Sequence, residues 1–125
     1  MSPLDVLEQR RAAVTACDAD AFADLFAPDG VIELPFAGAD VPDRIEGREA
    51  IRTFARAAMS AMRVDTLATL AVHRTDDPEV VVAEVLTRGV GRGDAFEGRS
   101  VQVFRIRDGR IVLFRDYTGP LRKPF

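Results

Sequence analysis

The segment FEGRSVQVFRIRDGRIVLFRDYTGP, residues 96–120, consists of two long runs rich in β-branched and aromatic residues, joined at Asp108-Gly109. Two such runs on either side of an Asp-Gly pair predict an antiparallel hairpin. Asp116 stands in the second run among apolar neighbours. Strands of this length need a cover on one face, and the helical segments before them would supply it. We therefore expect Asp116 to lie at a pocket between helices and sheet.

The register of the hairpin determines which side chains share a face with Asp116. A two-residue turn would pair Val101 with Asp116, whereas a three-residue loop with Gly109 in a left-handed bulge would pair Ser100 with Asp116. We favour the three-residue loop, which also pairs Gln102 with Phe114. The concave face then carries Ser100, Gln102, Phe104, Val112, Phe114 and Asp116. The outer face carries Val101, Val103, Arg105, Ile111, Leu113, Arg115 and Tyr117.

The outer face of the hairpin is too apolar to be left open to water, because Val101, Val103 and Leu113 lie on it. A second copy of the chain is the simplest cover. We therefore expect a homodimer that forms through this face of the sheet.

Apolar periodicity predicts the elements before the hairpin. Helical spacing is found over residues 3–17 and 21–26, and again from Gly47, after a short strand at 31–34 and a loop that continues through Arg44. Residues 64–74 and 79–88 have the composition of strands, and a glycine-rich connection at 89–93 leads into the hairpin. The order helix, helix, strand, helix and four antiparallel strands predicts an α+β fold with helices on one face of a curved sheet.

Composition limits the classes of function. The length of 125 residues, without repeats or linkers, indicates one domain, residues 1–125, and the net charge of -3 gives no reason to expect a nucleic-acid or anionic-membrane partner. Cys17 is the only cysteine, so an internal disulfide is excluded, and no apolar run approaches the ~20 residues of a membrane span. The only histidine, His73, excludes a multi-histidine metal site. We expect a cytoplasmic protein that uses no metal or other cofactor.

With these elements placed, the chain resembles the SnoaL-like members of the nuclear transport factor 2-like superfamily. The resemblance rests on LFAPDGVIELPF (residues 25–36), IEGREAIRTF (45–54) and VFRIRDGRIVLFRDYTGP (103–120). It implies a cone-shaped roll in which three N-terminal helices pack on a curved, mainly antiparallel sheet and enclose a pocket. The superfamily includes ketosteroid isomerases, limonene epoxide hydrolase, polyketide cyclases and phenazine-biosynthesis proteins, and also binders that are not enzymes, so the fold alone does not define the function.

The catalytic positions of the superfamily carry over only in part. Ketosteroid isomerases have their general base where this chain has Leu34, and their oxyanion-hole residues fall near Arg10 and Gln102. Steroid isomerase chemistry by that route is therefore not expected. In the resemblance to limonene epoxide hydrolase, Asp116 stands at the position of a catalytic carboxylate and Glu33 lies near the position of a polar residue that holds water. The Arg-x-Asp pair of that enzyme is missing from this chain. The phenazine-biosynthesis proteins are the nearest likeness, since they share an Arg-acid-aromatic ending and an acid near Glu33.

Asp116 and Glu33 are the candidate catalytic residues. Burial of Asp116 among apolar side chains would raise its pKa and make it a general acid or base near neutrality, and the alternative is a structural carboxylate paired with Arg115 or Arg122. Glu33 would face the pocket only if the strand register points it, rather than Leu34, inward, and otherwise it is a surface glutamate. If both acids share one cavity, one can give a proton while the other takes one.

Candidate substrate-binding residues complete the expected pocket. Arg10, on the buried side of the first helix, would bind a carboxylate or an enolate, or else extend along the core to a surface acid. The remaining candidates are Phe36, Phe54, Gln102, Phe104 and Phe114. The aromatic members of this set would otherwise be plain core.

These residues predict a cofactor-free enzyme of small-molecule metabolism, of isomerase, cyclase or epoxide hydrolase type. Its substrate would be mostly apolar and would carry a carbonyl or an epoxide. The alternative is a non-catalytic small-molecule binder, or a dimeric accessory protein of the same fold. Nuclear-transport-like protein binding is a weaker alternative, because nothing in the sequence indicates a groove for a partner peptide.

Overall fold

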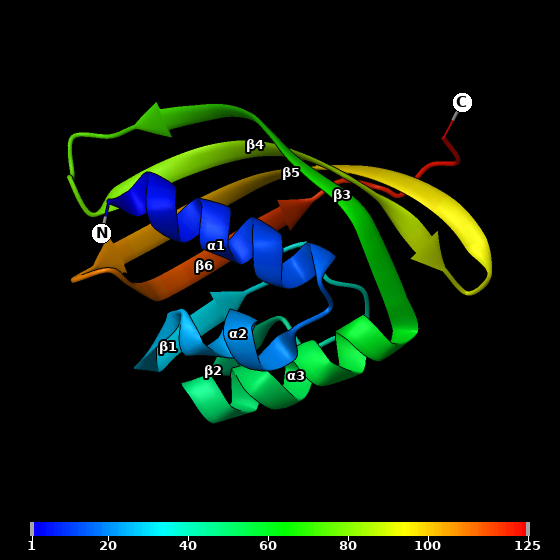
Figure 1. Cartoon of the computed structure of the whole chain (residues 1–125), viewed down its shortest axis with the longest axis horizontal. Helices are drawn as coiled ribbons and strands as arrows, with labels where there is room; N and C mark the ends of the chain where they lie inside the picture. The colour runs from blue at the N-terminus through cyan, green and yellow to red at the C-terminus, as the bar shows by residue number, and fades with distance from the viewer. Residues whose placement is uncertain (1, 125) are drawn as a thin grey trace.

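A computed structural model describes residues 2–124, which form an α+β fold (Figure 1). Along the chain the elements are α1 (Pro3–Thr15), α2 (Ala19–Asp24), β1 (Phe26–Glu33), β2 (Arg44–Glu46), α3 (Arg48–Ala61), β3 (Met62–Arg74), β4 (Val80–Gly91), β5 (Asp94–Arg107) and β6 (Arg110–Thr118). The strands make one sheet in the order β2-β1-β6-β5-β4-β3. All neighbouring strands are antiparallel except β1 and β6, which are parallel.

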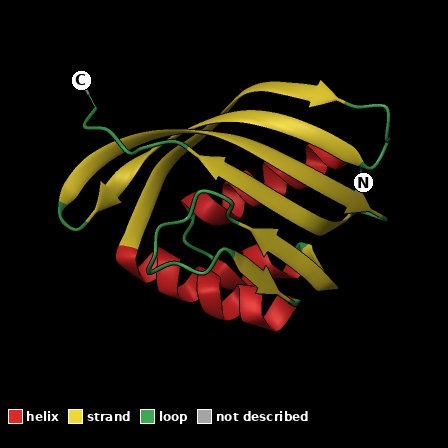
Figure 2. Cartoon of the chain, turned by 180° about the vertical axis from the view of Figure 1, so that it is seen from behind, coloured by secondary structure: helices red, strands yellow, loops and turns green. Residues whose placement is uncertain are grey.

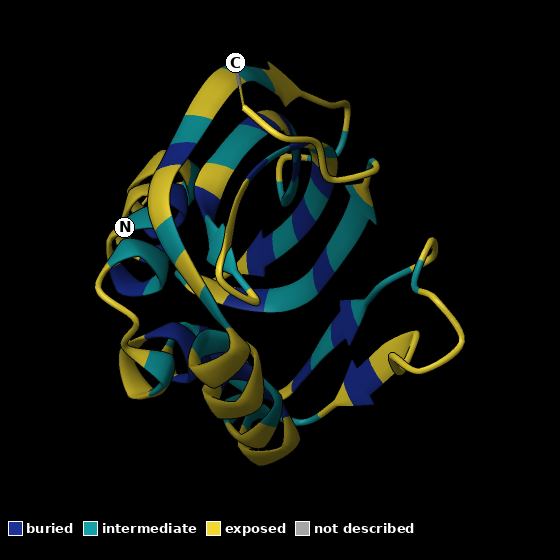
Figure 3. Cartoon of the chain, turned by 90° about the vertical axis from the view of Figure 1, so that its right-hand side faces the viewer, coloured by how far each residue is buried: buried dark blue, intermediate teal, exposed yellow. Residues whose placement is uncertain are grey.

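The helices cover one side of this curved sheet, as the view from behind also shows (Figure 2). Helix α1 is started by Ser2, whose side chain accepts from the backbone N–H of Asp5 while the Asp5 carboxylate accepts from Ser2. The buried face of α1 carries Val6, Leu7, Arg10 and Ala13. Buried positions alternate with more exposed ones along the strands (Figure 3), which is the pattern of a sheet packed on one side only.

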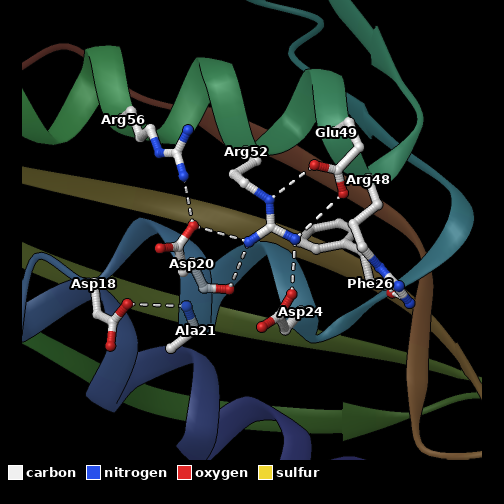
Figure 4. A network of polar contacts seen from close by, with 9 residues as sticks. All are labelled: Asp18, Asp20, Ala21, Asp24, Phe26, Arg48, Glu49, Arg52 and Arg56. Carbon is white, nitrogen blue, oxygen red and sulfur yellow. Dashed lines mark hydrogen bonds and ion pairs between the residues drawn. The ribbon is translucent and has the colours of Figure 1, made fainter.

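Helix α2 is held against α3 by a network of ion pairs centred on Arg52 (Figure 4). The Arg52 guanidinium donates to Asp20, Asp24 and Glu49, at 3.0, 2.8 and 3.0 Å, and Arg56 also donates to Asp20. The three carboxylates are mostly exposed, so the network contributes little stability and mainly fixes the relative position of the two helices.

The terminal hairpin has the two-residue turn that was the alternative in the sequence analysis, but beyond a bulge its pairing differs from both registers considered there. Asp108 and Gly109 have φ of 52° and 75°, as in a two-residue turn with both central residues in the left-handed region. A bulge then follows, in which Val112 is the extra residue between the Ile106–Ile111 and Arg105–Leu113 pairs. The pairing shifts by one position, so the predicted three-residue loop is wrong. Gln102 faces Asp116, and Phe104 faces Phe114.

The bulge explains which predicted faces are correct. Beyond it, Phe114 and Asp116 lie on the concave side with Gln102 and Phe104, as expected. Before it, Ile111 is fully buried in the core instead of on the outer face. The prediction for Ile111 was wrong because a bulge reverses the side on which every earlier residue of that strand points.

Two other boundaries differ from expectation. The Pro28-Asp29-Gly30 sequence is not a connection between the predicted second helix, residues 21–26, and the predicted strand at 31–34. It lies inside β1, where the pairing with β6 is irregular between Phe26 and Val31. The short strand β2, which pairs with β1, begins at the last residue of the predicted loop, Arg44, and was not expected.

The outer face of the sheet carries Val101, which is 43% exposed, together with half-buried Val103 and Leu113. The expected homodimer through this face stays a prediction. Within residues 2–124, every helix is too short or too polar to cross a membrane.

Candidate active site

A cavity of about 350 Å³ lies between the helices and the concave side of the sheet. Its polar side chains are Arg10, Thr87, Ser100, Gln102, Asp116 and Thr118. Its apolar lining includes Phe22, Ile32, Leu34, Phe54, Met59, Met62, Phe96, Phe114 and Leu121. The cavity is thus mainly apolar, with a small group of polar side chains contributed mainly by β5, β6 and α1. This is the usual character of a small-molecule site.

Asp116 is mostly buried and lies on β6 opposite Gln102. Burial raises the pKa of this carboxyl, and hydrogen bonding from Thr118, Gln102 and Ser100, together with the nearby charge of Arg10, only partly opposes the effect. The Oδ1 atom of Asp116 is buried and has no hydrogen-bond partner. The side chain therefore has the raised pKa and the free oxygen that a proton donor or acceptor needs.

Arg10 is the most unusual residue of the site, because its side chain is only 1% exposed. Its Nη1 donates to Oε1 of Gln102 at 2.7 Å, and its guanidinium lies 5.2 Å from the centre of the Phe104 ring. Its Nε and Nη2 have no partner. Burial lowers the pKa of Arg10 to about 10, although the Asp116 carboxylate favours the charged form.

The aromatic candidates divide into three groups. Phe54 and Phe114 line the cavity. Phe104 is fully buried behind them. Its ring stacks on that of Phe114 with 4.7 Å between the ring centres, and the Arg10 guanidinium lies over the Phe104 ring. Phe36 is 71% exposed and packs edge-on against Tyr117 outside the cavity, so the expectation that it lines the pocket was wrong. It lies in the loop after β1, where strand alternation no longer determines its direction.

Glu33 does not share the cavity with Asp116, contrary to the expectation of two acids in one pocket. Its carboxylate accepts from Arg44 at 2.9 Å and from Arg115 at 3.0 Å on the other side of the sheet. The neighbours of Glu33 in sequence, Ile32 and Leu34, line the cavity instead. The reason is the parallel pairing of β1 with β6, which sets Glu33 beside Arg115.

The alternative in which Asp116 pairs with Arg115 is not observed, because Arg115 bonds to Glu33. Sequence reasoning missed Thr118 as a site residue. It follows Asp116 by two positions on the same strand face, a signal that alternation alone would have given. Within the described chain, no group of three His, Cys, Asp or Glu side chains is arranged to hold a metal ion.

Comparison with known proteins identifies the family. The model of the SnoaL-like domain matches residues 7–114, and the chain belongs to this family. An uncharacterized PhzA/B-like protein of Pseudomonas aeruginosa is 36% identical over 107 residues, which cover 84% of this chain and 75% of the relative. The expected resemblance to SnoaL-like and phenazine-type proteins is thereby confirmed.

Solved structures agree with the family. A Bacillus subtilis protein provisionally named an isomerase superposes with a TM-score of 0.89 at 28% identity, covering 94% of this chain and 86% of that one. The Mycobacterium tuberculosis protein Rv0760c, in complex with estradiol-17beta-hemisuccinate, superposes with a TM-score of 0.81 at 26% identity, covering 94% of each chain. A Δ5-3-ketosteroid isomerase from Mycobacterium, at 20% identity, 98% and 100% coverage and a TM-score of 0.82, shows only that the fold is shared.

Proposed function

We propose that this SnoaL-like protein is a cofactor-free enzyme in which Asp116 moves a proton on a mostly apolar, carbonyl-bearing small molecule. The observation that carries the proposal is Asp116 itself, a mostly buried carboxyl that lines a cavity of about 350 Å³, has a raised pKa and has no hydrogen-bond partner at Oδ1. A carboxyl in this state takes a proton from carbon and returns it at neutral pH more readily than an ordinary surface aspartate does.

Proton transfer by one residue fits the site better than chemistry that needs two acids. Among the lining residues, Asp116 is the only carboxyl, since Glu33 is bonded to arginines on the other side of the sheet. A single carboxylate can remove a proton next to a carbonyl group and deliver it to another atom of the same enolate. Epoxide opening with separate acid and base residues has less support, because no second carboxyl or histidine lines the cavity.

The remaining polar residues would bind and orient the substrate. Gln102 holds Arg10, and Ser100 and Thr118 flank Asp116 on the same face of the sheet. The apolar lining, which includes Phe54 and Phe114, would exclude water from the reacting carbon. Exclusion of water keeps the pKa of Asp116 raised and strengthens its interaction with the substrate.

The test uses 2-tetralone, an apolar bicyclic ketone with readily exchanged protons next to its carbonyl. Deuterium uptake from D2O is followed by mass spectrometry with the wild type, Asp116→Asn and the control Asp94→Asn, which changes an exposed aspartate. We expect Asp116→Asn to lose about 100-fold or more of the catalysed rate, and Asp94→Asn to keep it. The wild-type rate should rise with pH through the raised pKa of Asp116, because the charged form is the base. Equal rates for Asp116→Asn and the wild type, or no catalysis by the wild type, would end the proposal.

A non-catalytic binder is the second candidate, and the scarcity of titratable groups in the cavity favours it. Beside Asp116, Arg10 is the only ionisable side chain of the lining. A related protein, Rv0760c, has been solved with a bound steroid ester. Binding of apolar ligands without any proton exchange, unchanged in Asp116→Asn, would support this function. A molar mass of two chains in solution, reduced to one by Val101→Glu, would support the dimeric form of either candidate.

A further inference from the structure

One edge of the Arg10 guanidinium has no hydrogen-bond partner. Nη1 is bonded to Gln102, whereas Nε and Nη2, whose N–H bonds lie along the other edge of the planar group, have no partner. The same residue is 1% exposed and borders the cavity. A buried arginine with two free donors is costly, and an unsatisfied group of this kind in a folded protein calls for an explanation.

No carboxylate is hydrogen-bonded to this charge, although Asp116 lies near enough to favour the charged form. Asp116 is the only carboxyl of the cavity, yet its Oδ1 has no partner and no Arg10 nitrogen donates to it. Phe104 supplies a ring face to the guanidinium, which is a weaker contact than an anion. Arg10 is therefore a buried cation without a hydrogen-bonded anion in the described structure.

We propose that the natural ligand of this cavity is a mostly apolar molecule with one carboxylate, and that the carboxylate binds the Nε–Nη2 edge of Arg10. The edge presents two parallel N–H donors, which match the two oxygens of a carboxylate, whereas a neutral carbonyl oxygen leaves the buried charge uncompensated. The remaining lining is apolar and accepts the hydrocarbon body.

Access to this edge needs a small movement. Nε and Nη2 are closed off by neighbouring atoms, so the guanidinium has to turn toward the cavity when the ligand binds. A long side chain that is held by one hydrogen bond, to Gln102, permits such a turn.

This inference rests on the proposed function, since it names the substrate class of the same cavity, but its test is a binding measurement that needs no turnover. Calorimetry compares 1-naphthylacetate with 1-naphthylacetamide, which has nearly the same shape and no charge. We expect the wild type to bind the acid about tenfold to hundredfold more tightly than the amide, the range of a charge-assisted bidentate contact. Arg10→Met should abolish this preference. Arg10→Lys, which keeps the positive charge but not the pair of parallel N–H donors, should retain part of it. The control Arg63→Met changes an exposed arginine and should bind like the wild type.

Equal affinity of the wild type for acid and amide, or no binding of the acid, overturns the inference without any folded variant being needed. A preference for the acid that survives in folded Arg10→Met also overturns it. If the preference fails while Asp116→Asn still abolishes exchange on 2-tetralone, the proposed catalysis stands and only the carboxylate is wrong. If the preference holds without any exchange, the protein is a binder of apolar acids.

Discussion

Arg10→Met is expected to leave the protein as stable as the wild type or slightly more stable. Arg10 is almost fully buried, and two of its three guanidinium nitrogens have no partner. Methionine is unbranched and apolar, and similar side chains, Met59 and Met62, already line the same cavity. The substitution therefore removes a buried charge without leaving a large void.

The magnitude follows from the pKa of Arg10, which burial lowers from the ordinary value of a guanidinium to about 10. At pH 7 the guanidinium is charged in both the folded and the unfolded state, so the lowered pKa measures the cost of holding the charge in the fold, about 3 kcal/mol. Against this, the variant loses a charged hydrogen bond of about 1.5 kcal/mol and a cation–π contact of about 1 kcal/mol. The expected change in the free energy of unfolding lies between zero and about 1 kcal/mol in favour of Arg10→Met, or up to about 4 °C in Tm.

Thermal and urea unfolding at pH 7 measure this difference. The double variant Arg10→Met with Gln102→Leu should be at least as stable as Arg10→Met, because it removes the amide oxygen that the single change leaves without its donor. The exposed control Arg63→Met should leave Tm almost unchanged. A loss of about 3 kcal/mol or more in Arg10→Met, the usual effect of breaking a satisfied buried ion pair, would refute the reasoning. It would show that Arg10 supports the fold and is not a binding group held there at a cost.

Two further predictions concern the sheet. Asp116 has a raised pKa in the folded state, so folding binds its proton more tightly and the stability from this group is lost as pH rises through that pKa. Asp116→Asn should therefore gain Tm relative to the wild type between pH 4 and pH 8, and parallel Tm–pH curves would contradict this. Gly89→Ala places a Cβ 1.9 Å from the backbone oxygen of Arg63 on β3 and should lose at least about 2 kcal/mol, whereas the matched Gly91→Ala meets only the Met62 side chain at 3.5 Å and should change stability by less than about 0.5 kcal/mol. Similar urea midpoints for the two alanine variants would contradict the predicted strand contact.

The fold could be predicted wherever a local pattern was strong. Alternation around Asp108-Gly109 gave the hairpin, and helical spacing gave α3. The strand β2, Arg44–Glu46, could not be found because three residues carry no period. The first part of β1 was missed because Pro28 and Gly30 usually mark turns, and only the pairing with β6 and β2 holds them in a strand.

The candidate site could be predicted only as far as the sequence showed which face of the sheet each strand residue points to. Asp116 was assigned to the correct face although its pairing partner was wrong, because the bulge at Val112 restored the side on which later residues point. The prediction for Glu33 depended in the same way on which residues of β1 point inward, and no hairpin partner fixed this. Glu33 lies on the face of the sheet opposite to the one expected for a catalytic residue. A one-residue uncertainty therefore left one acid correctly placed and moved the other out of the cavity.

The contact between Arg10 and Gln102 joins residues that are 92 positions apart, and no local pattern predicts it. What the sequence does contain is an arginine on the buried stripe of α1, beside Val6, Leu7 and Ala13. A cavity that bound only hydrocarbon would be more stable with an apolar residue at this position, by the same accounting that favours Arg10→Met. The buried guanidinium and the mostly buried Asp116 each oppose folding to some extent, and both line the cavity of about 350 Å³. Two such groups in one place are better explained by the chemistry of a bound molecule than by the stability of the fold.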